Sequence, residues 1–513
     1  MPEALERLVG GFLDHLARFH PVDASFIGIA GHDHRLPPAA PDTAEAERAS
    51  VAALLQALDR APPQDSAGGR LDARLMRASL LHAQAALDHW PRFVQPSWYT
   101  GEVAFGLISL LLPGARDIPP DALRQRLEAA PAFLADGLRH IGRRPTPADW
   151  CERARRECAA LDRLLATGLP MHPSWTQALE HPAGKAREAL AAFSQALQGL
   201  PDRAPACGRD YLALLMREVH GLAWSPEEAV AFASDAFRDL SARIEAHPAR
   251  TAAPDPVVPV ADLPSAYRHW HERTMATAGG LVTPATDYDL SFRPLPDWAA
   301  GVAGDLYFLS YRCPSALAAG TGSIYWTAPV PQPLTAVKQT HAMHHGSIGH
   351  HTQNARARKA ASRLARIGGN DCASGIALLA AGTMIEGWAC YVTELASELD
   401  GLYDERDDLA SLVAQRRNAA SVLADIGLHA GGWGLERMRS FYTDEAGFPA
   451  PRVWSETTRN SILPATRLMY FLGTRQIWDL RRTIGGDTRA FHDGFLSYGH
   501  VPVSWIGEEM ARG

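Results

Sequence analysis

The sequence predicts a large, elongated, mainly α-helical fold with a small β-sheet near a metal site. Three observations lead to this prediction. Apolar residues recur at three- and four-residue spacing through most of the chain, strand-like alternation is confined to one stretch of the second half, and several histidines crowd into one short run. Because 513 residues exceed the size of a single core, we expect an N-terminal helical lobe over residues 1–250 and a metal-binding catalytic lobe over residues 265–513. The alternative is one continuous domain.

The first half of the chain is predicted to be helical. Helical spacing of apolar residues is found over residues 5–19, 46–58, 71–87, 122–141, 150–165 and 186–200. A further helix is predicted to begin after Ser225, because this capping residue precedes a proline, and Glu228 follows it three positions later. That helix is expected to run to about residue 247.

The strand-like patterns follow a proline-rich stretch over residues 252–264, which is typical of a linker or long loop. Alternation or β-branched and aromatic enrichment is found over residues 288–292, 306–311 and 323–326. Helical spacing returns from about residue 333 and includes residues 409–429 and 466–482. We therefore expect a small sheet next to the helices that carry the chemistry.

Composition narrows the classes of partner. A net charge of -7 with 21% charged residues gives no basic surface for nucleic acid or for an anionic membrane. The first residues mix charged and apolar side chains at helical spacing, unlike a secretion signal, so the expected location is the cytoplasm. We expect a small-molecule or peptide-like substrate and neither nucleic acid nor membrane as a partner. The sequence does not determine the oligomeric state.

Five histidines fall within twelve residues: His341, His344, His345, His350 and His351. Neutral imidazole is the commonest protein ligand for zinc and similar metals. Crowded imidazoles without a metal suppress one another's protonation. The run therefore predicts a metal site, with a solvated polar helix end as the alternative.

Helix geometry leaves the ligating pair open. In an unbroken helix either His341 aligns with His345, four residues on, or His344 aligns with His351, seven residues on. His350 diverges from His344 in such a helix, and His345 points about 100° away from it. Gly346 and Gly349 weaken the helix, and an unwinding or bulge at these glycines would return His350 to the face of His344. Both His350 and His351 remain possible second ligands.

A third ligand is predicted at Glu386, which interrupts an apolar helical stretch. A buried carboxylate needs a metal, a cation or hydrogen-bond donors, so the alternative is an ion pair with an arginine such as Arg459 or Arg467. Asp425 and His429 are four residues apart and share one helix face. They are expected either to orient a ligand or substrate, or to form a satisfied core pair.

The chain resembles, nearly from end to end, the bacterial family known as domain of unknown function 885 (DUF885), which is regarded as zinc-metallopeptidase-like and mostly helical around a cleft. Residues 344–353, HHGSIGHHTQ, resemble the family motif HExxPGHHxQ, and residues 386–391, EGWACY, resemble EGWAxY. The resemblance implies His344, His350 and Glu386 as ligands of zinc, with His351 as the alternative to His350. Further family segments are similar to residues 425–429 and to residues 459–473, which include Arg459 and Tyr470.

The chain departs from the family pattern where a glutamate is expected to activate zinc-bound water, because His345 stands there. Ile348, Asn460 and Thr466 also replace family residues. We expect a metalloenzyme repurposed to a non-proteolytic reaction on an amino-acid- or peptide-derived substrate.

Three alternatives to this function remain. The first is a zinc hydrolase of amide or peptide bonds that uses His345 as its base. The second is a non-haem iron oxygenase, because two histidines and a carboxylate are also the ligand set of those enzymes. The third is a non-catalytic binder of metal or peptide. On each of the enzymatic interpretations we expect the same residues to serve the reaction: His345, Asp425, His429, Arg459 and Tyr470.

Overall fold

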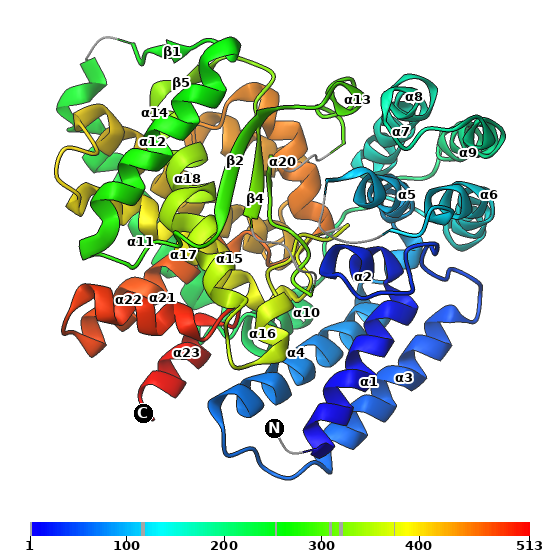
Figure 1. Cartoon of the computed structure of the whole chain (residues 1–513), viewed down its shortest axis with the longest axis horizontal. Coiled ribbons are helices and arrows are strands. Elements are labelled where there is room, and N and C mark those ends of the chain that lie inside the picture. Colours follow the sequence, from blue (N-terminus) through cyan, green and yellow to red (C-terminus); the bar gives the residue numbers. More distant parts are fainter. Residues whose placement is uncertain are drawn as a thin grey trace.

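Helices make up most of the structure and confirm the predicted mainly α-helical class (Figure 1). The computed structural model describes residues 3–113, 118–251, 254–306, 310–317, 322–373 and 375–512. The helices of the first half are α1 (Glu3–Phe19), α2 (Pro21–Ile27), α3 (Thr43–Asp59), α4 (Ala67–His89), α5 (Pro96–Leu111), α6 (Ala122–Ile141), α7 (Ala148–Arg163), α8 (Leu169–Met171), α9 (Glu180–Ala196), α10 (Arg209–Leu214) and α11 (Pro226–Glu245).

The start of α11 follows the predicted cap. The Ser225 hydroxyl accepts a hydrogen bond from the backbone N–H of Glu228, and the Glu228 carboxylate accepts one from the backbone N–H of Ser225. Two donors that the first helical turn leaves unpaired are satisfied in this way. The sequence-based prediction of this helix is confirmed.

The second half holds both the sheets and the helices that carry the predicted ligands. Its helices are α12 (Leu263–Thr277), α13 (Asp297–Ala300), α14 (Leu334–Ala336), α15 (Thr352–Ala357), α16 (Arg363–Ile367), α17 (Gly382–Leu395), α18 (Glu405–His429), α19 (Leu435–Ser440), α20 (Ala450–Ile462), α21 (Leu468–Ile484), α22 (Thr488–Ser497) and α23 (Val503–Met510). Among the described residues, no helix is long and apolar enough to cross a membrane.

The strands form two small sheets. In the larger one, β4 (Gly322–Thr327) lies between β2 (Asp289–Pro294), to which it is parallel, and β3 (Tyr311–Arg312), to which it is antiparallel. In the smaller one, β1 (Val257–Val258) pairs with β5 (Gln332–Pro333). The strand predicted over residues 306–311 falls partly on residues 307–309, which lie outside the described residues.

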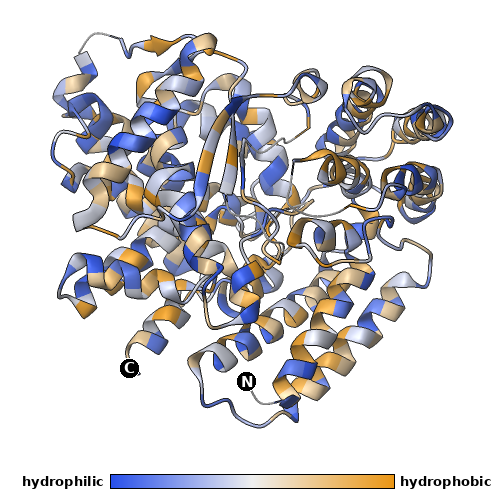
Figure 2. Ribbon diagram, viewed as in Figure 1, coloured by the Kyte–Doolittle hydropathy of each residue, from blue (hydrophilic) through white to orange (hydrophobic). Residues whose placement is uncertain are grey.

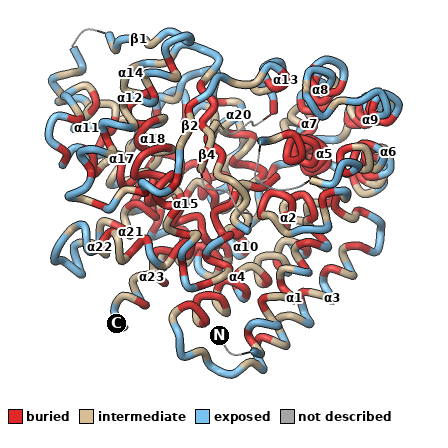
Figure 3. The backbone as a smooth tube through the Cα atoms, in the orientation of Figure 1, coloured by how far each residue is buried: buried red, intermediate tan, exposed pale blue. Residues whose placement is uncertain are grey.

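One buried apolar cluster extends from α1 to α23 and includes residues of both halves, such as Phe12 and Ile506. Figure 2 shows apolar positions along the inner faces of the helices, and Figure 3 shows buried backbone concentrated in the middle of the molecule. The two-lobe division at residues 250–265 and the central cleft stay predictions.

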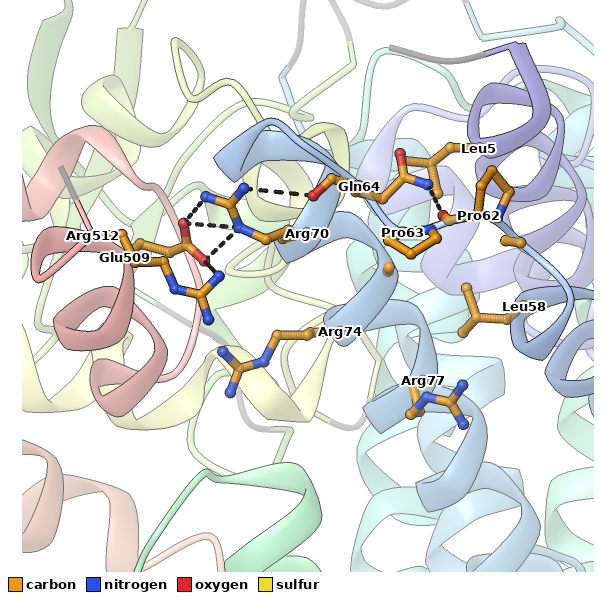
Figure 4. Close-up of a pocket in the computed structure, with 12 residues that line it drawn as sticks. Leu5, Leu58, Pro62, Pro63, Gln64, Arg70, Arg74, Arg77, Glu509 and Arg512 are labelled. Atoms are coloured by element: carbon orange, nitrogen blue, oxygen red, sulfur yellow. Dashed lines mark hydrogen bonds and ion pairs between the residues drawn. The ribbon is translucent and has the colours of Figure 1, made fainter.

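The chain ends meet in a corner that holds none of the predicted site residues. A cavity of about 280 Å³ lies among α1, α3, α4 and α23 (Figure 4). On its wall Arg70 of α4 forms an ion pair with Glu509 of α23, and Arg74 pairs with Glu508. These pairs connect one of the early helices to the last one.

Two glycines determine how closely α17 and α21 approach each other. A Cβ atom on Gly387 would stand 2.7 Å from the backbone carbon of Gly473, and one on Gly473 would stand 2.3 Å from the carbonyl oxygen of Thr383. No side chain fits in either place, so the two backbones touch. This contact puts Glu386 of α17 close to Tyr470 of α21.

Candidate metal centre

The histidine run lies on a helix that widens from α- to π-helical geometry and then breaks. From Val337 to His345 the backbone is π-helical, and at Gly346 it becomes extended, with φ -95° and ψ -151°. Gly349 is non-helical as well, with ψ -131°. A Cβ atom on Gly349 would lie 2.1 Å from the carbonyl oxygen of His344, and one on Gly346 would lie 2.6 Å from that of Ala342. Only glycine allows this break.

The break decides between the two open alternatives for the second histidine. The rings of His344 and His350 are 4.9 Å apart between centroids and nearly perpendicular. His351 instead packs 5.3 Å from Tyr288 and 5.8 Å from His271, again between ring centroids. The structure therefore brings His350, and not His351, beside His344.

Glu386 reaches this pair from α17. Its Oε2 atom lies 3.6 Å from Nε2 of His344 and 3.8 Å from Nε2 of His350. Burial raises the pKa of Glu386, but a hydrogen bond from His344, the charges of His350 and His344 and a hydrogen bond from Tyr470 outweigh burial and lower it to about 2. The carboxylate is ionised at neutral pH.

The arginines considered as alternative partners of Glu386 belong to another network. Arg467 pairs with Glu456 and donates to Asn460. Burial raises the pKa of Glu456, but the charges of Arg467, Arg452 and Arg459 outweigh it. Arg459 and Arg467 thus serve Glu456, whereas Glu386 faces imidazoles and Tyr470.

His345 lies in the same cluster. One ring nitrogen from each of His344, His345 and His350 lies within 4.8 Å of the other two. The His345 ring also packs against the sheet, with its centroid 6.4 Å from that of Tyr311 and 5.8 Å from that of Tyr325. Burial, followed by the charges of His344 and His350, holds its pKa well below the ordinary value.

Two sequence-based expectations can be compared with this position of His345. The small sheet beside the histidines is confirmed. In a regular α-helix His345 is expected to point about 100° away from His344, and the structure places the two ring centroids 4.8 Å apart. The backbone from Val337 to His345 is π-helical and not α-helical as that expectation assumes.

Sequence reasoning overlooked the role of Gln353. Its Oε1 atom lies 3.0 Å from Nδ1 of His350, so it accepts the Nδ1 proton and leaves Nε2 facing Glu386 as a free lone pair. Its amide nitrogen donates to the carbonyl oxygens of Met384 and Ile385, at 3.0 and 3.3 Å. Gln353 therefore fixes both the tautomer of His350 and its position relative to α17. Its place in the HHxQ motif was the only indication in the sequence.

Asp425 and His429 lie on one face of α18, as predicted, with Oδ1 and Nε2 3.6 Å apart and both side chains fully buried. Asp425 accepts hydrogen bonds from the backbone N–H groups of Ala465 and Arg467. His429 donates from Nε2 to the carbonyl oxygen of Asn460 at 2.9 Å. Burial raises the pKa of Asp425 to about 7 and lowers that of His429 to about 4.

These contacts are those of a satisfied core pair, the second of the two interpretations considered for Asp425 and His429. Every hydrogen bond described for the pair leads to backbone groups and none to the histidine cluster. The catalytic roles predicted for Asp425, His429 and Arg459 stay predictions. Tyr470, by contrast, touches the predicted ligand Glu386.

Comparison with known proteins confirms the family. The family model described as "Bacterial protein of unknown function (DUF885)" matches residues 21–510. The chain belongs to this family. No curated protein matches it significantly.

Two solved structures share the fold of this DUF885 protein. One is that of a candidate lipoprotein of unknown function from Shewanella oneidensis, with a TM-score of 0.75, 18% identity and 99% of each chain covered. The other is that of a candidate lipoprotein from Colwellia psychrerythraea, with a TM-score of 0.74, 16% identity and coverage of 100% of this chain and 99% of that one. At these identities the likeness concerns the fold alone.

Proposed function

We propose that this DUF885 protein is a metal-dependent enzyme on a metallopeptidase-like scaffold, and that it carries out a non-proteolytic reaction on a small amino-acid- or peptide-derived substrate in the cytoplasm. One observation carries the proposal. His344 and His350, separated by a glycine break, both face the ionised carboxylate of Glu386 at 3.6 and 3.8 Å. Two imidazoles and a carboxylate form an open ligand set of the catalytic kind.

The donors fit a divalent transition metal, with zinc as the first candidate and iron as the second. Gln353 accepts the Nδ1 proton of His350, so Nε2 of His350 is unprotonated and can bind a metal. The side chain of Glu386 is 19% exposed and has no arginine or lysine among its described partners. A cation between these side chains would satisfy all three, and it would supply Lewis-acid activation of a bound substrate.

The reaction is proposed to be non-proteolytic because the residue beside the first ligand is His345. The family motif has a glutamate there, whose carboxylate would accept a proton from the attacking water. Loss of a general base costs about 100- to 10,000-fold in rate. In the surroundings described above, no other carboxylate replaces it next to His344.

The substrate class is suggested by the charged groups that interact with Glu386 and its neighbour Asp371. Asp371 has a pKa of about 6, because burial raises it, the charge of Arg312 lowers it, and the charge of Glu386 raises it again. Arg312 and Glu386 are therefore both near Asp371. A positive and a negative side chain beside the ligands suit a zwitterion, such as an amino acid or the end of a peptide.

Elemental analysis of chelator-free protein tests the proposal. We expect about one tightly bound transition metal per chain, and metal removal should abolish turnover in a screen of amino-acid derivatives and small peptides. A mixed peptide pool should stay uncleaved by the metal-loaded protein. Metal-free protein with unchanged stability and activity would refute the metal function, and efficient peptide cleavage would make the protein a hydrolase with His345 as the base.

A further inference from the structure

We propose that His345 is a third imidazole ligand, so that His344, His345, His350 and Glu386 form one coordination sphere. The inference rests on the proposed metal function, and it adds a ligand at the position where the family motif has a glutamate. It also makes a specific statement about chemistry: a nitrogen bound to the metal is not free to act as a base.

The distances support a shared ion. Imidazole nitrogens and carboxylate oxygens lie about 2.0–2.2 Å from zinc, so the ligand atoms of a tetrahedral site are about 3.3–3.5 Å from one another. The carboxylate of Glu386 is already 3.6 Å from His344 and 3.8 Å from His350. The three imidazole nitrogens lie within 4.8 Å of one another. Small rotations of the rings therefore bring the three imidazole nitrogens to one point, and the carboxylate of Glu386, which lies near His344 and His350 only, has to shift toward His345 to share the ion.

The surroundings of His345 give it no other polar partner. Among the described residues, no hydrogen bond reaches either of its ring nitrogens, and its ring packs against Tyr311, Tyr325 and the neighbouring histidines. The His345 side chain is only partly buried, so solvent reaches it, and a ring nitrogen stays available to an ion that enters the cluster.

His341, one turn earlier, shows the contrast within the same segment. Its Nδ1 atom lies 2.6 Å from the hydroxyl of Tyr325, and its ring stacks on Tyr267 with centroids 4.5 Å apart. This histidine is satisfied by the protein and lies outside the cluster of three. It serves as the matched control for His345.

Four protein donors change which metal suits catalysis. They fill a tetrahedral zinc site completely, and such closed sites are structural. A reaction then requires a metal that accepts five or six ligands, and iron does so with imidazole and carboxylate donors. The third imidazole thus favours the second of the two candidate metals and leaves one or two positions for substrate.

Cobalt(II) titration of the His345→Cys variant tests the assignment directly. A thiolate bound to cobalt(II) gives an intense charge-transfer absorption in the near ultraviolet, whereas an unbound thiol does not. We expect this band in the His345→Cys variant and not in the His341→Cys variant. We also expect the His345→Ala variant to bind cobalt(II) at least about 100-fold more weakly than the wild type, since even residues that only support a ligand contribute about 10- to 100-fold.

X-ray absorption on cobalt-loaded wild-type protein keeps the test decisive if the variants do not fold, because it counts the imidazoles around the metal. Three support the proposal and two overturn it. Cobalt-loaded His345→Cys protein without the charge-transfer band, together with unchanged affinity in His345→Ala, would also overturn it and leave the proposed function standing. A wild-type protein that takes up no cobalt(II), iron(II) or zinc would refute both the assignment of His345 as a ligand and the proposed metal function.

Discussion

Replacing Gly349 by alanine should damage the metal centre more than any other single-methyl addition in the chain. The new Cβ atom would stand 2.1 Å from the carbonyl oxygen of His344 and 2.3 Å from that of Met343. Real Cβ contacts are not shorter than 3.0 Å, so the backbone has to move by about 0.9 Å. Both obstructing atoms are backbone, and no side chain can rotate to relieve the contact.

The expected cost has two parts. Overpacking of this kind typically destabilises a protein by about 1–3 kcal/mol. The same shift separates His344 from His350, and changes that disturb the orientation of a metal ligand typically cost about 10- to 100-fold in metal affinity. We therefore expect the Gly349→Ala variant to unfold at lower denaturant concentration and to bind cobalt(II) about 10- to 100-fold more weakly than the wild type.

The control is Gly184→Ala in α9, where a Cβ atom meets nothing within 4 Å. Alanine in a helix interior stabilises by about 0.5–1 kcal/mol relative to glycine, so this variant should be as stable as the wild type or more so. Urea unfolding and cobalt(II) titration of the three proteins make the comparison. Wild-type stability and wild-type cobalt affinity in Gly349→Ala would refute the argument that the glycine break builds the site.

Three further outcomes are expected. The Glu386→Ala variant should lose bound metal by at least about 100-fold in affinity, whereas Glu456→Ala, which removes the partner of Arg467, should keep it; equal metal content in both variants would make Glu386 a structural residue. The Gln353→Ala variant should bind metal about 10- to 100-fold more weakly, since His350 loses its fixed tautomer, and an unchanged affinity in isothermal titration would contradict that role. Burial raises the pKa of Asp425 to about 7 from the ordinary value of about 3.9, so this group contributes stability that is complete below about pH 4 and is lost as the pH rises through 7. Between pH 5 and 8 the wild type should therefore lose up to about 3 kcal/mol more stability than Asp425→Asn, and parallel curves from denaturant unfolding at each pH would show that the raised pKa is absent.

The helices of the first half were largely predictable because most are amphipathic. The longest helix of the first half that periodicity missed is α5, which spans Pro96–Leu111 and is buried on every side. A helix without a polar face has no 3.6-residue pattern to detect. Of the strand predicted over residues 306–311, Tyr311 lies in β3, and residues 307–309 lie outside the described residues.

The candidate site was predictable in its residue types but not in its geometry. The sequence indicated that Gly346 and Gly349 weaken the helix, yet the choice between His350 and His351 depends on the ψ angle of Gly349, which only the packed structure fixes. The same holds for His345, whose ring position beside that of His344 is seen only in the structure. The role of Gln353 could not be derived from spacing, because the side chain contacts two different elements: His350 of the histidine run and the backbone of α17.

The spacing of the proposed ligands along the chain has a consequence for folding. His344, His345 and His350 come from one short stretch, and Glu386 comes from a helix about 40 residues further on, so a bound ion would close a loop that contains α15 and α16. Closing a loop of this length in the unfolded chain removes conformational freedom that folding otherwise has to overcome. The metal would then act as a reversible cross-link. In its absence this loop, which also carries Asp371, would be less protected from proteases and hydrogen exchange than in the metal-bound protein.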